Sequence, residues 1–194
     1  QDYSDLGLGP ALIQRKDSKL QSIHWNSIFW CNVAMNWIGF AIISIGFSRL
    51  AAIYYGEEIL YHLVIGLSLK LIWSPFIFIH RIKLNKAMNF KRVFIIQASG
   101  VIVGGIVGVV MAYSGFGVWS LVGQSLSGSL VNLPVAWFLV SWKPSFDFNF
   151  KAIKGLLSFG VFELVARMIT FFHKNANVLI LGGLFNSAFV GYFV

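Results

Sequence analysis

Charged residues are scarce in this chain, and their scarcity excludes most soluble folds. Asp, Glu, Lys and Arg make up 11% of the 194 residues, while 57% are hydrophobic; ordinary soluble domains contain about 25% charged residues. This composition predicts an all-α integral membrane protein. The formal net charge is +8, but the basic residues form short clusters between apolar runs. Proteins that bind nucleic acid present a basic surface interleaved with aromatic residues, which this pattern lacks, so we expect no nucleic-acid partner.

Residues that carry out catalysis or bind metals are also few. Cys31 is the single cysteine, so neither a disulfide framework nor a thiolate metal site is available. The four histidines are scattered without an HExxH motif, and the acidic residues form no Asp-x-Asp pair. The sequence therefore predicts no metal, no cofactor and no enzymatic activity. Ser-His-Asp catalysis is not excluded by sequence alone, but no residue favours it.

Long apolar runs are what the chain has instead. About 20 helical residues cross a hydrocarbon layer about 30 Å thick, and we predict five complete crossings and the start of a sixth. These are residues 27–47, 59–79, two legs within 93–142, 152–172, and a run that begins at 178. The first connection is predicted at residues 48–58. Because the chain opens on Gln1 and stops inside an apolar run, we expect an internal fragment of a longer protein.

The run of residues 93–142 contains fifty residues without one Asp, Glu, Lys or Arg. A single helix of that length would measure about 75 Å, so the run must double back, most simply at residues 114–117. Gly100, Gly104 and Gly108 recur at every fourth residue of the first leg. Such a stripe of small residues predicts close packing against a neighbouring helix.

Basic residues distinguish the two sides of the membrane. The connections at residues 1–26, 80–92 and 141–154 contain eleven Lys or Arg, and the alternate connections contain two. The positive-inside rule therefore makes the first set cytoplasmic. Five basic residues of the second connection are predicted to attract anionic headgroups at the membrane surface; they are Arg81, Lys83, Lys86, Lys91 and Arg92.

Lys70 lies near the midpoint of the crossing at residues 59–79. It either snorkels or pairs with an acidic side chain of another helix, or it faces a cavity and meets substrate; we favour the cavity, because charges at membrane depth usually face protein or water. Gly66, Trp73 and Ser74 are predicted to share its helical face. Pro75 is predicted to bend this helix.

Glu163 and Arg167 stand four residues apart in the crossing at residues 152–172. Two interpretations have equal weight: a self-neutralising structural ion pair, or a role in a transport pathway. In either case this face is predicted to look into the protein or an aqueous cavity.

Seven short segments form an ordered series along the chain. They are DLGLGPALIQRKD (5–17), YYG (54–56), GFGVWS (115–120), SWKP (141–144), FG (159–160), Gly182 and GY (191–192). In this order they resemble polysaccharide flippases of the Wzx/RfbX type, in the multidrug/oligosaccharidyl-lipid/polysaccharide exporter superfamily. Many members carry an acidic residue where this chain has residues 174–177 (KNAN), so the role of that carboxylate is not carried over.

The resemblance implies a two-lobe transporter of twelve to fourteen helices. Residues 1–142 would be the latter part of the N-terminal lobe, and residues 143–194 the linker and the beginning of the C-terminal lobe. The implied task is to flip undecaprenyl-diphosphate-linked oligosaccharide across the bacterial cytoplasmic membrane. Its partners would be that substrate, membrane lipids and other membrane proteins of polysaccharide assembly. On the physical grounds of depth and charge, and not from the resemblance, Lys70 and Arg167 are expected to hold the diphosphate, and protonation or cation binding at Glu163 is a hypothesis for coupling.

Two alternatives stay open at this stage. The same architecture could export a small cation or drug, in which case acidic residues would dominate the cavity. The protein could also be a membrane-embedded polysaccharide polymerase or ligase, but such enzymes typically carry a large periplasmic loop, and every outer connection predicted here is short.

Overall fold

The computed structural model describes residue 12, residues 22–150, residues 165–166 and residues 169–170. Within these residues the regular structure is helical and no strand forms, as the composition predicts. The elements are α2 (Ser22–Ile42), the π-helix η3 (Ile43–Phe47), α3 (Ser48–Tyr55), α4 (Ile59–Ser68), α5 (Lys70–Lys86), α6 (Phe90–Tyr113) and α7 (Trp119–Leu139).

The first apolar run forms a longer helix than the sequence predicts. α2, η3 and α3 follow one another without a break, so that Ser22–Tyr55 is a single rod of 34 residues. The prediction of a connection at residues 48–58 is wrong, because Ser48–Tyr55 is helical. A charged residue such as Arg49 does not interrupt a helix. The rod ends at Gly56, whose φ of 67° is readily adopted by glycine.

The second rod consists of α4 and α5, which are separated by a break at Leu69. It extends seven residues past the predicted end at residue 79, to Lys86, because Lys and Arg are good helix formers. α5 continues through Pro75, and the interruption lies six residues earlier, at Leu69. There the Ile72 N–H bonds to the Leu69 carbonyl three residues back. The bend at Pro75 stays a prediction.

The run of residues 93–142 doubles back as predicted. α6 ends at Tyr113, α7 begins at Trp119, and the turn between them contains Gly115 and Gly117 with φ of 84° and 54°. Gly100, Gly104 and Gly108 are buried, and a methyl group at Gly104 would come within 2.7 Å of the Gln124 carbonyl oxygen on α7. The predicted glycine stripe is therefore confirmed as a packing surface.

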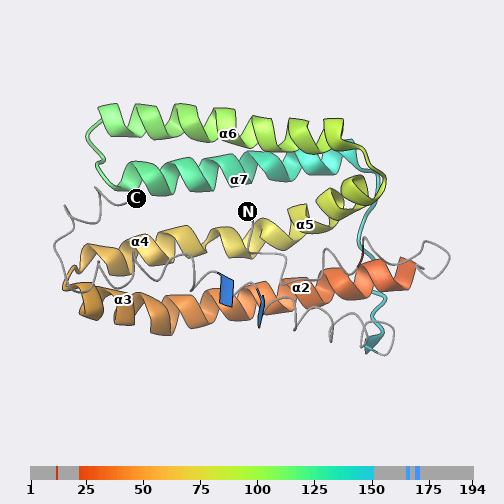
Figure 1. Cartoon of the computed structure of the whole chain (residues 1–194), viewed down its shortest axis with the longest axis horizontal. Helices are drawn as coiled ribbons and strands as arrows, with labels where there is room; N and C mark the ends of the chain where they lie inside the picture. The colour runs from red at the N-terminus through yellow and green to blue at the C-terminus, as the bar shows by residue number, and fades with distance from the viewer. Residues whose placement is uncertain (1–11, 13–21, 151–164, 167–168, 171–194) are drawn as a thin grey trace.

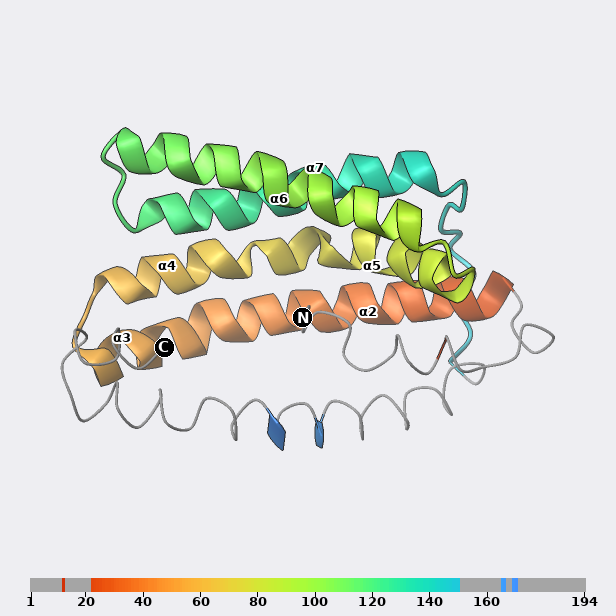
Figure 2. The ribbon, with the colours of Figure 1, turned by 45° about the horizontal axis from the view of Figure 1, so that its top comes forward.

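The rods lie side by side in the order α6, α7, α4–α5 and α2–α3 (Figures 1 and 2). The α3–α4 and α6–α7 turns lie at one end, whereas the start of α2, the α5–α6 turn and the exit from α7 lie at the other. This alternation places the basic residues 81–92 at the same end as the segment after α7, in agreement with the predicted topology.

Two apolar clusters hold this second end together. One joins α2 to α5 through Phe29, Phe78 and Ile79. The other joins α5 to α6 and α7 through Ile77, Ile96 and other side chains. Because lipid is as apolar as these side chains, van der Waals packing rather than removal from water stabilises the contacts in a bilayer.

Three of the described helical segments are long and apolar enough to cross a membrane: Ser22–Tyr55, Ile59–Lys86 and Phe90–Tyr113. α7 is a helix of 21 residues and is not one of the three. Of the predicted fifth crossing the structure describes only residues 165–166 and 169–170, which are helical, and the predicted sixth lies outside the described residues. The helix count and the two-lobe division at residue 142 therefore stay predictions.

Candidate functional site

Lys70 is the first residue of α5 and directly follows the helix break at Leu69. Its side chain is exposed, so the structure leaves it accessible to substrate, solvent or lipid. Whether it faces a cavity stays a prediction.

The three predicted neighbours of Lys70 contact two different helices. The Trp73 indole N–H donates to the Ser129 hydroxyl of α7, at 3.0 Å. Ser74 instead donates to the Asn36 side-chain oxygen of α2, at 3.2 Å. Gly66 is buried, and a methyl group there would lie 3.0 Å from Val122 of α7. Much of the helical face that Lys70 was predicted to present to a cavity is therefore packed against neighbouring helices.

Two irregular backbone stretches meet near the depth of Lys70. The π-helix Ile43–Phe47 lies opposite the break at Leu69, and the Ser44 and Ser68 hydroxyls are 3.3 Å apart. Ser48 donates to the Ser44 carbonyl at 2.7 Å, and Ser68 to the Ile65 carbonyl at 2.8 Å. Hydroxyls thus satisfy carbonyl groups beside both irregularities. Single-turn π-helices inside α-helices are frequent at functional sites.

Buried amides line the contact between α2 and α5. The Asn36 amide donates to the Asn32 backbone carbonyl at 2.9 Å and to the Asn32 side-chain oxygen at 3.1 Å. Asn32 is fully buried, and its Nδ2 finds no hydrogen-bond partner among the residues that the structure describes. Buried donors without an acceptor are destabilising. The contact between α2 and α5 therefore contains one buried donor, Asn32 Nδ2, whose hydrogen bonding is incomplete among the described residues.

The five predicted headgroup residues lie at one end of the helices but serve different contacts. Lys83 Nζ lies 4.7 Å from the Trp25 ring centroid and 4.9 Å from that of Trp142. Lys86 Nζ donates to the Leu12 carbonyl at 3.0 Å. The remaining three are the half-buried Arg81 and the exposed Lys91 and Arg92. Lys83 and Lys86 therefore hold the fold together, and headgroup attraction by the whole set stays a prediction.

The segment after α7, residues 140–150, is fastened to the start of α2; we term it the connector. Asn26 is buried and donates to the Ser145 hydroxyl, while its side-chain oxygen accepts the Ser145 N–H at 3.3 Å. Trp30 donates to the Ser145 carbonyl at 2.9 Å and stacks on Phe146. Ser27 accepts the Asn149 N–H at 2.8 Å.

His80 joins the connector to α5. It is fully buried, with Nδ1 lying 2.8 Å from the Phe76 carbonyl oxygen and Nε2 lying 3.2 Å from the Trp142 carbonyl oxygen. Its ring also packs on the rings of Trp137 and Trp142, at centroid distances of 5.1 and 5.7 Å. This histidine is a packed structural group that bridges α5, α7 and the connector.

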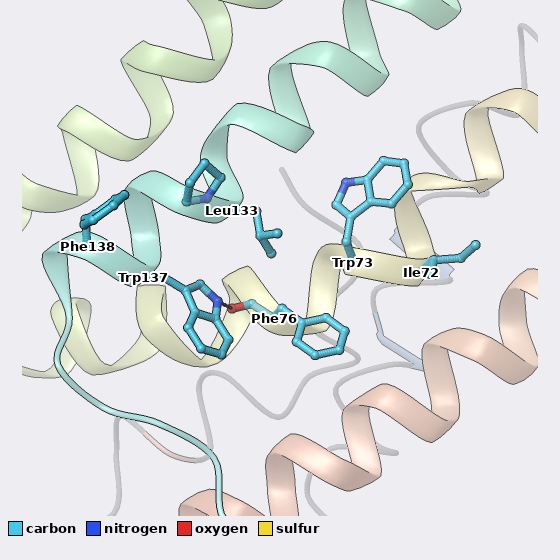
Figure 3. Close-up of a pocket in the computed structure, with 7 residues that line it drawn as sticks. Ile72, Trp73, Phe76, Leu133, Trp137 and Phe138 are labelled. Atoms are coloured by element: carbon cyan, nitrogen blue, oxygen red, sulfur yellow. Dashed lines mark hydrogen bonds between the residues drawn. The ribbon is translucent and has the colours of Figure 1, made fainter.

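An apolar groove of about 490 Å³ runs between α5 and α7 (Figure 3). The Trp137 indole N–H crosses it to donate to the Phe76 carbonyl at 3.2 Å, the contact drawn in Figure 3. We term this apolar groove the α5–α7 groove. It is lined by Ile72, Trp73, Phe76, Leu133, Pro134, Trp137 and Phe138.

Glu163 and Arg167 lie outside the described residues, so their pairing and their placement stay predictions. Among the residues that the structure does describe, no group of three His, Cys, Asp or Glu side chains could hold a metal ion.

The buried polar contacts and the α5–α7 groove are the features that sequence reasoning missed. Asn32 and Asn36 stand four residues apart in an uncharged run, a spacing that places both on one helical face and could have indicated a polar helix contact. The contacts of Trp73 with Ser129 and of Trp137 with the Phe76 carbonyl could not have been predicted from sequence, since no local pattern relates α5 to α7.

Comparison with known proteins finds a family match over nearly the whole chain. A family model described as "Polysaccharide biosynthesis protein" matches residues 2–194. The chain is 24% identical over 194 residues to the teichuronic acid biosynthesis protein TuaB of Bacillus subtilis, an alignment that covers 97% of the chain and 39% of TuaB. No solved structure gives a significant match.

Two further relatives have similar identity. The succinoglycan biosynthesis transport protein ExoT of Rhizobium meliloti is 27% identical over 168 residues, which cover 85% of the chain and 33% of ExoT. The lipopolysaccharide biosynthesis protein WzxC of Escherichia coli is 24% identical over 194 residues, which cover 97% of the chain and 38% of WzxC. The chain thus spans about two fifths or less of the length of each relative.

Proposed function

Because the chain belongs to the polysaccharide biosynthesis protein family, we propose that the full-length protein flips a lipid-linked oligosaccharide from the cytoplasmic to the outer leaflet. The chain is part of a multi-pass protein of the bacterial cytoplasmic membrane. One relative, ExoT, is named as a transport protein, which favours a transporter over an enzyme. The substrate class proposed is undecaprenyl-diphosphate-linked oligosaccharide.

Physical chemistry sets the requirements for this task. A diphosphate-sugar headgroup cannot enter hydrocarbon without a large desolvation penalty, so it needs a polar path, whereas its polyprenyl tail can stay in lipid. The observation that supports the proposal most directly is Lys70, an exposed cation at a helix break near the midpoint of an apolar rod. A cation at that depth is suited to a diphosphate.

The irregular backbone beside Lys70 supports a substrate pathway whose helices can move relative to one another. Leu69 keeps helical dihedral angles (φ −53°, ψ −32°), so the irregularity beside Lys70 is a local change in backbone hydrogen bonding and not an unwound segment. Transporters commonly place substrate sites at irregular helices. In our proposal the break at Leu69 and the π-helix Ile43–Phe47 let the two rods adjust as the lobes rock. Arg167 would assist Lys70, and protonation or cation binding at Glu163 would couple the cycle.

The test is the leaflet on which the lipid-linked oligosaccharide accumulates when the full-length gene is deleted. In the deletion strain we expect complete repeat units on the cytoplasmic leaflet. They should be protected from a membrane-impermeant glycan-modifying reagent until the membrane is permeabilised. A plasmid copy of the gene should restore their exposure. Complete but unpolymerised units on the outer leaflet of the deletion strain would contradict flipping and favour the polymerase or ligase alternative.

A further inference from the structure

The α5–α7 groove has a lining that suits hydrocarbon. Of its polar groups, the Trp73 indole N–H is bound to Ser129 and the Trp137 indole N–H to the Phe76 carbonyl. An indole has no other hydrogen-bonding atom. The remaining lining side chains are aliphatic or phenyl groups, so the groove offers almost nothing to a hydroxyl group or a water molecule. Polar ligands such as sugars would lose hydrogen bonds on entering it.

The groove reaches the end of α7, which the positive-inside rule predicts to be cytoplasmic. Its wall on α7 includes Phe138, and the carbonyl of the next residue, Leu139, accepts a hydrogen bond of 2.9 Å from Arg92 Nη1. Arg92 is exposed, as is Lys91 beside it. A guanidinium group has five N–H donors in a fork that matches phosphate. Arg92 can therefore hold Leu139 and still bind an anion at the mouth of the groove.

We propose that the α5–α7 groove binds one acyl chain of an anionic phospholipid from the cytoplasmic leaflet, with the lipid phosphate at Arg92. Charge complementarity selects this occupant, because the cytoplasmic leaflet carries the anionic lipids and basic pockets between membrane helices on this side bind their headgroups. The bound lipid would act as a partner of α5 and α7 rather than as transported cargo. The proposal is independent of flipping.

A photoreactive residue in the groove identifies the occupant directly. Phe138→p-benzoylphenylalanine conserves an aromatic ring at an exposed position of the groove wall. Ile106→p-benzoylphenylalanine on α6, whose side chain is 59% exposed and does not line the groove, controls for non-specific labelling from the half of the helix nearer the α6–α7 turn; the matched control is Arg92→Gln combined with the probe at position 138. These variants of the full-length protein are irradiated in native membranes, and the adducts are identified by mass spectrometry.

We expect anionic phospholipid adducts at position 138 to exceed the bulk proportion of these lipids about fivefold, the effect of one basic residue near the surface. Position 106 should report the lower anionic proportion of the outer leaflet, so the comparison that decides is position 138 with and without Arg92. Arg92→Gln should return position 138 to the bulk proportion, and Arg92→Lys should retain part of the enrichment.

Four outcomes would overturn the proposal. They are bulk proportions at position 138, an enrichment that Arg92→Gln leaves unchanged, an adduct with a polyprenyl carrier, and an adduct with protein, either another segment of this protein or a second molecule. Membrane abundance of each variant is measured alongside, so that misfolding is distinguished from loss of lipid. The leaflet assay does not depend on any of these results, and its failure would leave this proposal standing.

Discussion

Two adjacent glycines on α6 allow a matched test of the packing between α6 and α7. Gly104 is buried against α7, where a methyl group would lie 2.7 Å from the Gln124 carbonyl oxygen and 3.4 Å from the Gly128 Cα. Gly105 is the next residue, and a methyl group there would meet nothing within 4 Å. The same substitution therefore has opposite consequences at neighbouring positions.

The magnitude follows from these distances. At Gly104 the methyl group would be about 0.7 Å closer to a carbonyl oxygen than the 3.4 Å at which ordinary contact begins. The oxygen belongs to the backbone, so the helices must separate, and overpacking of this kind destabilises by about 1–3 kcal/mol. At Gly105 the better helix propensity of alanine should stabilise by about 0.5–1 kcal/mol. We expect the two variants to differ by roughly 1.5–4 kcal/mol.

The assay is unfolding of the full-length protein in mild detergent by increasing SDS, followed by circular dichroism, with thermal denaturation as a second measurement. Gly104→Ala should shift the transition to lower SDS, and Gly105→Ala should leave it unchanged or raise it. Equal transitions for the two variants would show that α6 and α7 do not approach each other closely through this stripe. Gly128→Ala provides a second reporter on α7, because a methyl group there would lie 2.6 Å from the Gly100 carbonyl oxygen.

Two further predictions concern the connector and Lys70. Asn26→Ala removes the amide that donates to the Ser145 hydroxyl and the oxygen that accepts the Ser145 N–H, which should destabilise that contact by about 1–3 kcal/mol and accelerate hydrogen exchange in residues 141–150. Lys143→Ala, at an exposed connector position, should not. Lys70→Ala should lower polysaccharide export at equal membrane abundance, and Lys70→Arg should retain more of it because the charge is kept. Normal export by both Lys70 variants would remove Lys70 from the pathway.

The helical rods could be predicted from sequence because length and apolarity restrict what a membrane allows. Fifty uncharged residues must fold back on themselves, and Gly115 and Gly117 mark where they do so. Helix ends were harder to predict. The predicted first crossing ends at residue 47, two residues before Arg49, yet Arg49 is helical, and the rod continues until Gly56 supplies a left-handed residue.

The contacts of the candidate site could be predicted only in part. Lys70 could be predicted because a single cation within an apolar run is a local signal in the sequence. Asn26 and Ser145 are 119 residues apart, and neither residue carries a local signal that relates it to the other. The same holds for His80, whose ring lies between carbonyl groups of α5 and the connector. Such pairings depend on how the rods lie beside one another, which periodicity does not specify.

The glycine contact between α6 and α7 has a consequence for how the protein enters the membrane. α6 is apolar enough to span alone, whereas α7 is not among the spans that qualify by length and composition. The turn between them carries no charge, so moving it across the bilayer requires no transfer of an ion. We expect α6 and α7 to insert as a preformed helical hairpin, in which the glycine stripe lets the more apolar helix carry the less apolar one. Biogenesis of this bundle would then depend on the same contact that stabilises it once folded.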